Sequence, residues 1–219
     1  MMRPDAKRSI ESYARLAAGY DRSCRLVMPL RHEAVAALGL RGGETVLDVA
    51  CGTGLSLPLL AEAVGGSGRV IGVEHSRDMM DIARRRVADG GWRNVELVGD
   101  SLERARLPSG IQAILFHFTH DVLQSDAALE NIFAASCAGA RVVSAGTKLT
   151  SWGLVPVNLW VLWRARRYLT TYANLREPWR HLSPHVPELR VESRLLDTAY
   201  LAVGTLARGA PCPTDGGNP

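Results

Sequence analysis

The sequence has few of the features that mark secreted, metal-binding or membrane-spanning proteins. Its four cysteines form no CxxC pair and show no metal-ligand spacing, which favours unpaired thiols in a reduced, cytoplasmic compartment and no bound metal. No apolar segment typical of a signal peptide follows Met1, and no window reaches the roughly 18 apolar residues of a membrane span. Aromatic residues are only 6% of the chain and the basic residues are scattered, so nucleic acid is not the expected partner.

The composition that remains is typical of one globular domain. The chain has 219 residues, of which 47% are hydrophobic and 22% charged, with a net charge of +4. We expect a single α/β domain over residues 1–206, with a helical cover at 1–40 and a substrate-side insertion at 147–188. The proline- and glycine-rich residues 207–219 are expected to form a disordered tail.

The chain is organised around the stretch Val46–Gly54, a short apolar strand that runs into a glycine turn. Gly52 and Gly54 allow left-handed backbone and the close approach of a ligand, and Asp48 would face the same crevice. A dinucleotide-binding fingerprint needs a third small residue, but Leu55–Leu57 follow the turn. The stretch resembles motif I of the class I S-adenosylmethionine-dependent methyltransferases, which has a hydrophobic pair, an acid, two variable residues and Gly-x-Gly.

This resemblance covers residues 13–204, is strong up to about residue 146, and favours the group of small-molecule and ubiquinone or menaquinone C-methyltransferases. It implies a Rossmann-like, doubly wound sheet of seven mostly parallel strands with an antiparallel last strand and helices on both faces. An acid follows each of three expected strands, at Asp48, Glu74 and Asp100. Glu74 is placed to accept hydrogen bonds from ribose hydroxyls, and the resemblance implies that Asp100 binds the adenine amino group.

The cofactor implied is S-adenosylmethionine. Cys51 is interpreted as a small residue that packs under the glycine loop rather than as a nucleophile, Ser76 as a helix cap, and Met79 as either an adenine neighbour or a core residue. The predicted cofactor contacts are Tyr13, Tyr20, Asp48, Ala50, Cys51, Gly52, Gly54, Glu74, His75, Met79, Asp100, Ser101, Leu102, Phe116 and His117.

The chemistry is expected beyond the strand at residues 111–118, because ligands lie at the carboxyl ends of parallel strands. A base is needed only if the acceptor carries a proton, and His120, Asp121 and Tyr20 are the candidate catalytic residues. Structural interpretations stay open: Tyr13 and Tyr20 could pack the leader onto the domain, His117 could bind near the cofactor, and His120 could cap a helix. The Asn or Asp, two prolines and aromatic residue typical of nucleic-acid and protein amino-methyltransferases are absent at this place.

Residues 152–163 form a tryptophan-rich stretch without charge that ends in Arg164, Arg166 and Arg167. It is interpreted as a lid over an apolar substrate, as an interfacial helix on anionic lipid, or as a helix packed on the sheet or at a dimer seam. The first interpretation makes Trp152, Trp160 and Trp163 substrate contacts. Neither a monomer nor a homodimer is favoured.

The sequence thus predicts a methyltransferase that acts on a hydrophobic small molecule, a secondary metabolite, quinone-like compound or lipid, at O, N or C. Two alternatives stay open. An RNA or protein methyltransferase would use Arg84–Arg86 and Arg164–Arg167 as a polyanion surface, although Arg84–Arg86 is interpreted as a solvated helix face. A regulator would bind the nucleoside without turnover.

Overall fold

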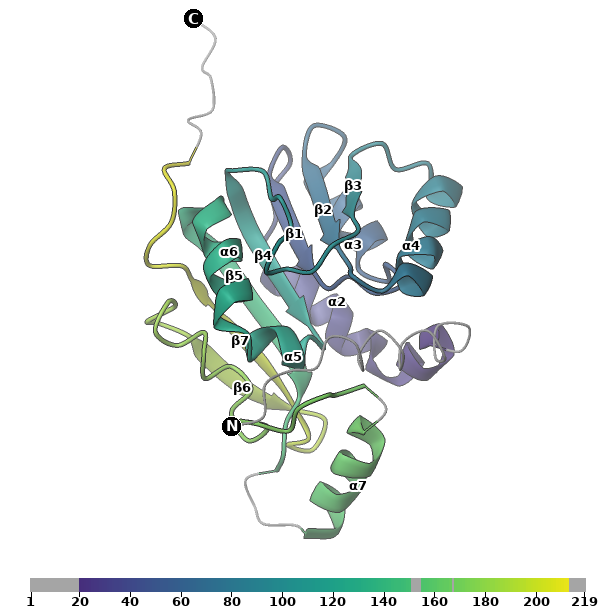
Figure 1. Cartoon of the computed structure of the whole chain (residues 1–219), viewed down its shortest axis with the longest axis vertical. Helices are drawn as coiled ribbons and strands as arrows, with labels where there is room; N and C mark the ends of the chain where they lie inside the picture. The colour runs from purple at the N-terminus through teal and green to yellow at the C-terminus, as the bar shows by residue number, and fades with distance from the viewer. Residues whose placement is uncertain (1–19, 151–154, 167, 213–219) are drawn as a thin grey trace, which may run out of the picture.

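The computed structural model describes residues 20–150, 155–166 and 168–212 (Figure 1). Two predicted site residues, Tyr13 and Trp152, lie outside these described ranges, as does the helix expected over residues 10–19.

The core of the fold is one seven-stranded sheet with the order β3-β2-β1-β4-β5-β7-β6. β7 pairs antiparallel with both β5 and β6, and the other pairs are parallel. The predicted Rossmann-like sheet with an antiparallel last strand is therefore confirmed. The strands are β1 (Thr45–Val49), β2 (Arg69–Val73), β3 (Val95–Val98), β4 (Ile111–His117), β5 (Ser136–Thr147), β6 (Arg190–Arg194) and β7 (Ala199–Thr205).

Helices cover both faces of the sheet, as Figure 1 shows. Side chains of α2, α3 and α4 share one core cluster with the sheet, and those of α6 share the other. The described helices are η1 (Arg25–Val27), α2 (Met28–Ala37), α3 (Leu57–Val64), α4 (Arg77–Gly90), α5 (His120–Leu123), α6 (Asp126–Ala135) and α7 (Val155–Ala165). None of these helices is long and apolar enough to cross a membrane.

The alternation of side chains along the central strands decides which polar groups face α2. In β1, Val46 packs in the α2 cluster whereas Leu47 and Val49 pack in the α6 cluster, so Asp48 falls on the α2 face. In β4, Ala113 and Leu115 also pack on the α2 face, and two residues further on His117 points the same way. The period of two thus brings an acid and a histidine to one side of the sheet's carboxyl edge.

The chain enters β5 earlier than the sequence predicted. The helix expected to run to Ala138 ends at Ala135, and residues 136–140 are already extended, with Gly139 at φ +79°. Residues 207–212, expected to be part of a disordered tail, supply the reason. Ala138 N–H donates to Ala210 O at 3.0 Å, and Ala210 N–H donates to Ser136 O at 2.8 Å. This pairing satisfies backbone groups that a helix would otherwise satisfy.

The same segment corrects the interpretation of the cysteines. Cys137 and Cys212 form a disulfide across a separation of 75 residues, whereas Cys24 and Cys51 are free and buried. A pair so distant in the chain has no spacing signature. Only the return of the tail to β5 brings the two thiols together.

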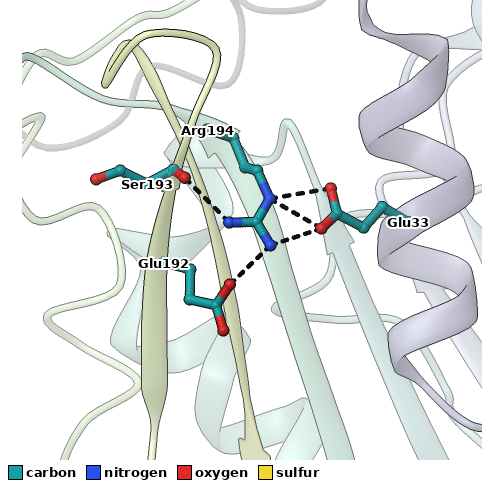
Figure 2. A network of polar contacts seen from close by, with 4 residues as sticks. All are labelled: Glu33, Glu192, Ser193 and Arg194. Atoms are coloured by element: carbon teal, nitrogen blue, oxygen red, sulfur yellow. Dashed lines mark hydrogen bonds and ion pairs between the residues drawn. The ribbon is translucent and has the colours of Figure 1, made fainter.

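An ion-pair network ties the edge of the sheet to α2 (Figure 2). The Arg194 guanidinium on β6 donates to both carboxylate oxygens of Glu33, with Nε to Oε1 at 2.8 Å and Nη2 to Oε1 at 2.6 Å. Its Nη2 also donates to Glu192 at 2.8 Å. The hydrogen bond from Arg194 lowers the pKa of Glu33 below its usual range. This fork fixes α2, which carries Arg31, against the far end of the sheet.

Candidate functional site

The candidate site lies at the carboxyl ends of β1, β2 and β4. Two non-glycine residues there adopt a left-handed backbone conformation, Ala50 at φ +50° and Phe118 at φ +58°. Such conformations cost about 1 kcal/mol or more each and cluster at functional sites. Both lie directly after a central strand, where the backbone must turn away from the sheet.

The glycine turn has the predicted left-handed backbone, with Gly52 at φ +61° and Gly54 at φ +79°. The two glycines serve different contacts. A Cβ on Gly54 would lie 2.7 Å from Leu57 Cδ1 and 3.3 Å from Ala83 Cβ, so this glycine lets the turn pack against α3 and α4. A Cβ on Gly52 would be 4.0 Å from Tyr20 Cε1 and would meet no closer atom of the described chain. Gly52 is therefore the position with open space beside its main chain.

Glu74, at the end of β2, braces this turn. Its Oε2 accepts from Gly52 N–H at 3.0 Å and its Oε1 accepts from Ser76 N–H at 2.7 Å. The side chain is buried, and burial raises the pKa of the carboxyl above its ordinary value. The carboxylate keeps acceptor capacity for a further donor. Ser76 does not cap α4 with its side chain as predicted, and its Oγ has no partner in the described chain.

Asp48 is buried beneath the turn, and burial raises its pKa to about 7 while the positive charge of Arg31 opposes that rise. Its Oδ2 has no hydrogen-bond partner among the described residues. Cys51 packs in the α2 cluster, and burial raises the pKa of its thiol far above the ordinary value. A thiol of this kind is a poor nucleophile, in agreement with the packing role predicted for it.

The remaining predicted cofactor residues separate into two groups. Asp100 accepts from Ser101 N–H at 2.7 Å and from Arg104 Nη2 at 3.2 Å, and these bonds lower its pKa. Its carboxylate stays accessible beyond β3. The side chains of Leu102 and Phe116 instead belong to the α6-side core, because the alternation of β4 turns Phe116 away from the α2 face. Met79 is buried at the start of α4.

The N-terminal cover contacts the glycine turn through a residue that the sequence analysis did not single out. Asp21 Oδ1 accepts from Thr53 Oγ1 at 2.6 Å, and Asp21 Oδ2 accepts from Arg86 Nη2 at 2.5 Å. Arg86 also donates through Nε to Thr53 O at 2.8 Å. Of the arginine run predicted to be mostly solvated, Arg84 and Arg85 are exposed, whereas Arg86 is partly buried by these contacts. This cluster holds Tyr20 beside Gly52.

A cavity of about 150 Å³ opens next to the turn. It brings together three predicted site residues, Tyr20, His120 and Trp160, and one that the sequence did not indicate, Arg31. The residues lining it are Tyr20, Ser23, Cys24, Val27, Arg31, Phe118, Thr119, His120, Gly146, Thr147, Trp160, Val161, Ala165, Tyr168, Leu169, Pro178, Leu195, Thr198, Ala199 and Tyr200.

Burial favours the neutral form of both histidines at the end of β4, His117 and His120. Burial lowers the pKa of His117 far below its ordinary value, and the Arg31 charge acts in the same direction. Burial also lowers the pKa of His120, against the opposing effects of Asp121 and of the Ala173 backbone. Neither ring nitrogen of His120 makes a hydrogen bond of ordinary geometry within the described chain. His120 thus contributes a neutral ring to the cavity wall, and both of its nitrogens are buried.

Asp121 does not join His120 in the cavity lining. Its Oδ2 accepts from Thr170 N–H at 3.0 Å and from Thr170 Oγ1 at 2.6 Å. These bonds fasten the segment after α7 to α5. The position gives Asp121 an anchoring contact rather than contact with a ligand in the cavity.

The two described tryptophans of α7 lie in different surroundings. Trp160 lines the cavity, whereas Trp163 lies outside it, with the Arg166 guanidinium 5.4 Å from its ring centroid. Both rings are 54% exposed. The expected joint presentation of the two rings to a substrate is therefore not seen in the lining of the cavity.

The polar groups around the glycine turn suit a nucleoside with an amino-acid end. Asp48 Oδ2, Ser76 Oγ, His75 Nε2 and both ring nitrogens of His117 are buried without a hydrogen-bond partner in the described chain. Buried polar atoms are normally paired, so this concentration beside one turn indicates a polar ligand. His75 also keeps its Nδ1 3.7 Å from Glu74 Oε1. These residues fit S-adenosylmethionine in donor and acceptor chemistry.

Comparison with known proteins agrees with this geometry. Residues 46–138 match the family model described as a methyltransferase domain. A demethylmenaquinone methyltransferase of Oceanobacillus iheyensis is 40% identical over 74 residues, which cover 33% of this chain and 31% of that protein. A second one, from Listeria monocytogenes, is 32% identical over 97 residues, which cover 42% of this chain and 41% of that protein. The chain thus spans well under half the length of the curated relatives that it matches.

Solved structures agree on the fold. A methyltransferase from Aquifex aeolicus that depends on S-adenosylmethionine superposes with a TM-score of 0.60 at 23% identity, over 80% of this chain and 89% of that one. A structure of a methyltransferase activator in complex with a methyltransferase from Haloferax volcanii gives a TM-score of 0.66 at 16% identity, over 93% of this chain and 98% of the matched one.

Proposed function

We propose that this chain, which has the fold of the class I S-adenosylmethionine-dependent methyltransferases and a methyltransferase domain at residues 46–138, methylates a hydrophobic small molecule at O, N or C. The observation that carries the proposal is the juxtaposition of two sites. A turn braced by Glu74 is surrounded by polar atoms that have no hydrogen-bond partner among the described residues, and an apolar cavity lies beside it. Tyr20 belongs to both, because it lies beside Gly52 and lines the cavity.

The residues of the turn would hold the cofactor. Gly52 offers open main chain, Glu74 has remaining acceptor capacity for hydroxyl groups, and Asp100 offers an accessible carboxylate beyond β3. When bound, S-adenosylmethionine supplies a methyl group on a positively charged sulfur. The cavity then orients the acceptor and excludes water from it.

His120 is proposed to act as the base when the acceptor carries a proton. Its ring is neutral near pH 7 because burial lowers its pKa, and it lines the cavity that would hold the acceptor. Acceptors that are already ionised would not need it. Tyr20, the other candidate in the lining, lies beside Gly52 and is proposed to orient the two ligands.

The proposal of a hydrophobic acceptor is supported more by the residues that line the cavity than by the names of the matched relatives. The matched relatives are named for demethylmenaquinone, which favours a quinone-like acceptor. However, the family match ends at residue 138, and α7, the β6–β7 turn and β7 border the cavity from beyond that point. The mostly apolar wall supports a hydrophobic molecule, of which a quinone-like compound is one example.

We further propose that such an acceptor enters from an anionic lipid surface. The exposed large hydrophobic side chains of the described chain all lie in three segments that border the cavity, residues 20–27, 155–172 and 195–196. From Arg164 through Arg176 the sequence has four basic residues and no acidic one. An exposed apolar surface next to a basic stretch matches an anionic bilayer in both polarity and charge.

The first experiment is calorimetric titration of the full chain with S-adenosylmethionine and S-adenosylhomocysteine. We expect both to bind, and Glu74→Gln to weaken binding about tenfold or more, a loss of roughly 1.4 kcal/mol. Glu96→Gln is the matched control, because Glu96 lies on the neighbouring strand β3 and pairs with Arg69 at the surface, away from the turn. If the unaltered chain binds neither compound, the proposal is refuted.

The alternative of an RNA or protein methyltransferase makes a different prediction for the acceptor. A polyanion bound by surface arginines would lose affinity steeply with salt, whereas a molecule in an apolar cavity would not. An acceptor screen at two salt concentrations therefore separates the two classes. Cofactor binding without turnover of any acceptor would favour the regulator.

A further inference from the structure

The cavity contains a buried cation whose charge the described chain leaves unpaired. Arg31, on α2, is 5% exposed and lines the cavity. Its Nη1 donates to the hydroxyl of Ser56, and its Nε has no hydrogen-bond partner in the described chain. None of the ion pairs found among the described residues includes it. Burying a charge without a counter-charge is costly, so this position calls for an anion.

The nearest acid does not supply that anion. Asp48 lies on the same face of the sheet, and Arg31 acts on it electrostatically, but none of the ion pairs among the described residues joins the two. Burial raises the pKa of Asp48 to about 7, so near neutral pH a large share of these carboxyls carry a proton. The other titratable neighbour is His117, whose pKa is lowered by burial and by the Arg31 charge, so its ring is neutral and supplies no negative charge. The counter-charge is therefore missing from the face that Arg31 occupies.

The size and lining of the cavity limit which ligand can supply this negative charge. Its volume is about 150 Å³, and a cavity of roughly that volume holds one benzene-sized ring. Apart from Arg31 and His120, the wall is made largely of apolar and aromatic side chains such as Val27, Phe118 and Tyr200. A single ring with one oxygen next to Arg31 fills such a space, while a longer apolar part of the molecule would extend past Trp160 toward the surface.

We propose that Arg31 is the anion-binding residue of the acceptor cavity, and that the acceptor is a ring-sized group bearing a carboxylate, phenolate or enolate oxygen. The identification of the ligand as a methyl acceptor rests on the proposed function, whereas the anion site itself does not. For a hydroxylated ring, the O–H bond breaks, the proton forms an N–H bond on the neutral ring of His120, and the electron pair stays on the oxygen beside Arg31. The cation thus selects acceptors that ionise at oxygen over amines.

The amino-acid end of the cofactor also carries a carboxylate, and Ser56 places Arg31 close to the start of α3. The acceptor is favoured because Arg31 lines the same cavity as His120 and Trp160. The experiment therefore has an arm for each source of the anion.

The acceptor arm measures binding of benzoate and of its neutral isostere benzamide to the full chain, by ligand-observed NMR without cofactor. We expect benzoate to bind more tightly than benzamide by about tenfold to a hundredfold, the range of a charge-assisted hydrogen bond. Arg31→Gln should abolish the preference, Arg31→Lys should keep part of it, and Arg69→Gln, at an exposed arginine on β2, should leave it unchanged. The comparison within the unaltered protein does not depend on how well a variant folds.

The cofactor arm measures binding of S-adenosylmethionine and of its decarboxylated form. Arg31→Gln should leave the affinity for both within about twofold, which would support the acceptor assignment. Weaker binding of the intact cofactor alone would move the anion site to the cofactor and overturn that assignment. The anion-site proposal would be overturned if the unaltered protein bound benzoate and benzamide equally and Arg31→Gln did not change the affinity for the cofactor. If the unaltered protein binds no cofactor at all, the proposed function fails while the benzoate arm still tests Arg31.

Discussion

Among single residues, Asp48 is the acid whose ionisation the fold alters most clearly. An acid with a raised pKa keeps its proton in the folded chain at pH values where the unfolded chain has released it. The free energy of unfolding therefore falls as pH rises from about 4 toward the folded pKa of about 7. The raised pKa of Glu74 acts in the same direction, and the Arg31 charge acts against it.

We predict that Asp48→Asn removes much of this dependence. Between pH 5 and pH 8 the unaltered chain should lose on the order of 2 kcal/mol more unfolding free energy than the variant, because the amide has no proton to release. Urea unfolding of both proteins at several pH values, without ligand, measures the difference. Parallel curves would show that Asp48 titrates normally in the folded chain.

At the scale of elements, α7 has an inner and an outer side. Trp160 and Trp163 are equally exposed and lie one helical turn apart, but only Trp160 lines the cavity. The sequence predicted equal roles for them. The structure makes each a control for the other.

We predict that Trp160→Ala weakens binding of an apolar ring compound such as benzoate by about tenfold, because it removes part of the wall. Trp163→Ala should change that binding by less than about twofold, since it removes only a surface contact with Arg166. Ligand-observed NMR gives both values, and calorimetry should show unchanged cofactor affinity. Equal losses for the two variants would mean that the whole face of α7 binds the ligand.

At the scale of the whole molecule, the exposed large hydrophobic side chains of the described chain lie around the opening of the cavity. Leu26, Leu159 and Leu196 come from three separate parts of the chain, and their segments border the same cavity. In Figure 1, α7 lies beyond the carboxyl edge of the sheet, on the side opposite the loops between α3 and β2. One end of the molecule is therefore apolar and basic.

We predict that the full chain sediments with vesicles of phosphatidylglycerol and phosphatidylcholine more than with phosphatidylcholine alone, and less as salt is raised. Leu196→Asp should reduce the bound fraction several-fold, since this side chain is 97% exposed and its loss removes little packing. Ser67→Asp is the control, because it adds the same charge in the exposed loop before β2. Equal sedimentation of the two variants would argue against a lipid contact at this end.

The sequence by itself determined the sheet, the glycine turn and the acids around it. These features depend on local patterns: apolar strands of period two, glycines with left-handed backbone, and an acid at or just after the end of each of the first three strands. The predicted fold class is confirmed by the strand order, and the predicted left-handed backbone is present at Gly52 and Gly54.

Only the tertiary structure decided the contacts between parts distant in the chain. Arg31 enters the cavity because α2 packs against β4 and β5, and Cys137 meets Cys212 because the tail returns to β5. Asp21 contacts Arg86 because the N-terminal segment packs against α4. Trp160 lines the cavity and Trp163 does not, because the orientation of α7 turns only Trp160 toward it. Such contacts depend on how elements pack, and packing has no signature in local spacing. The sheet and the glycine turn were therefore predictable from the sequence, whereas the lining of the cavity needed the fold.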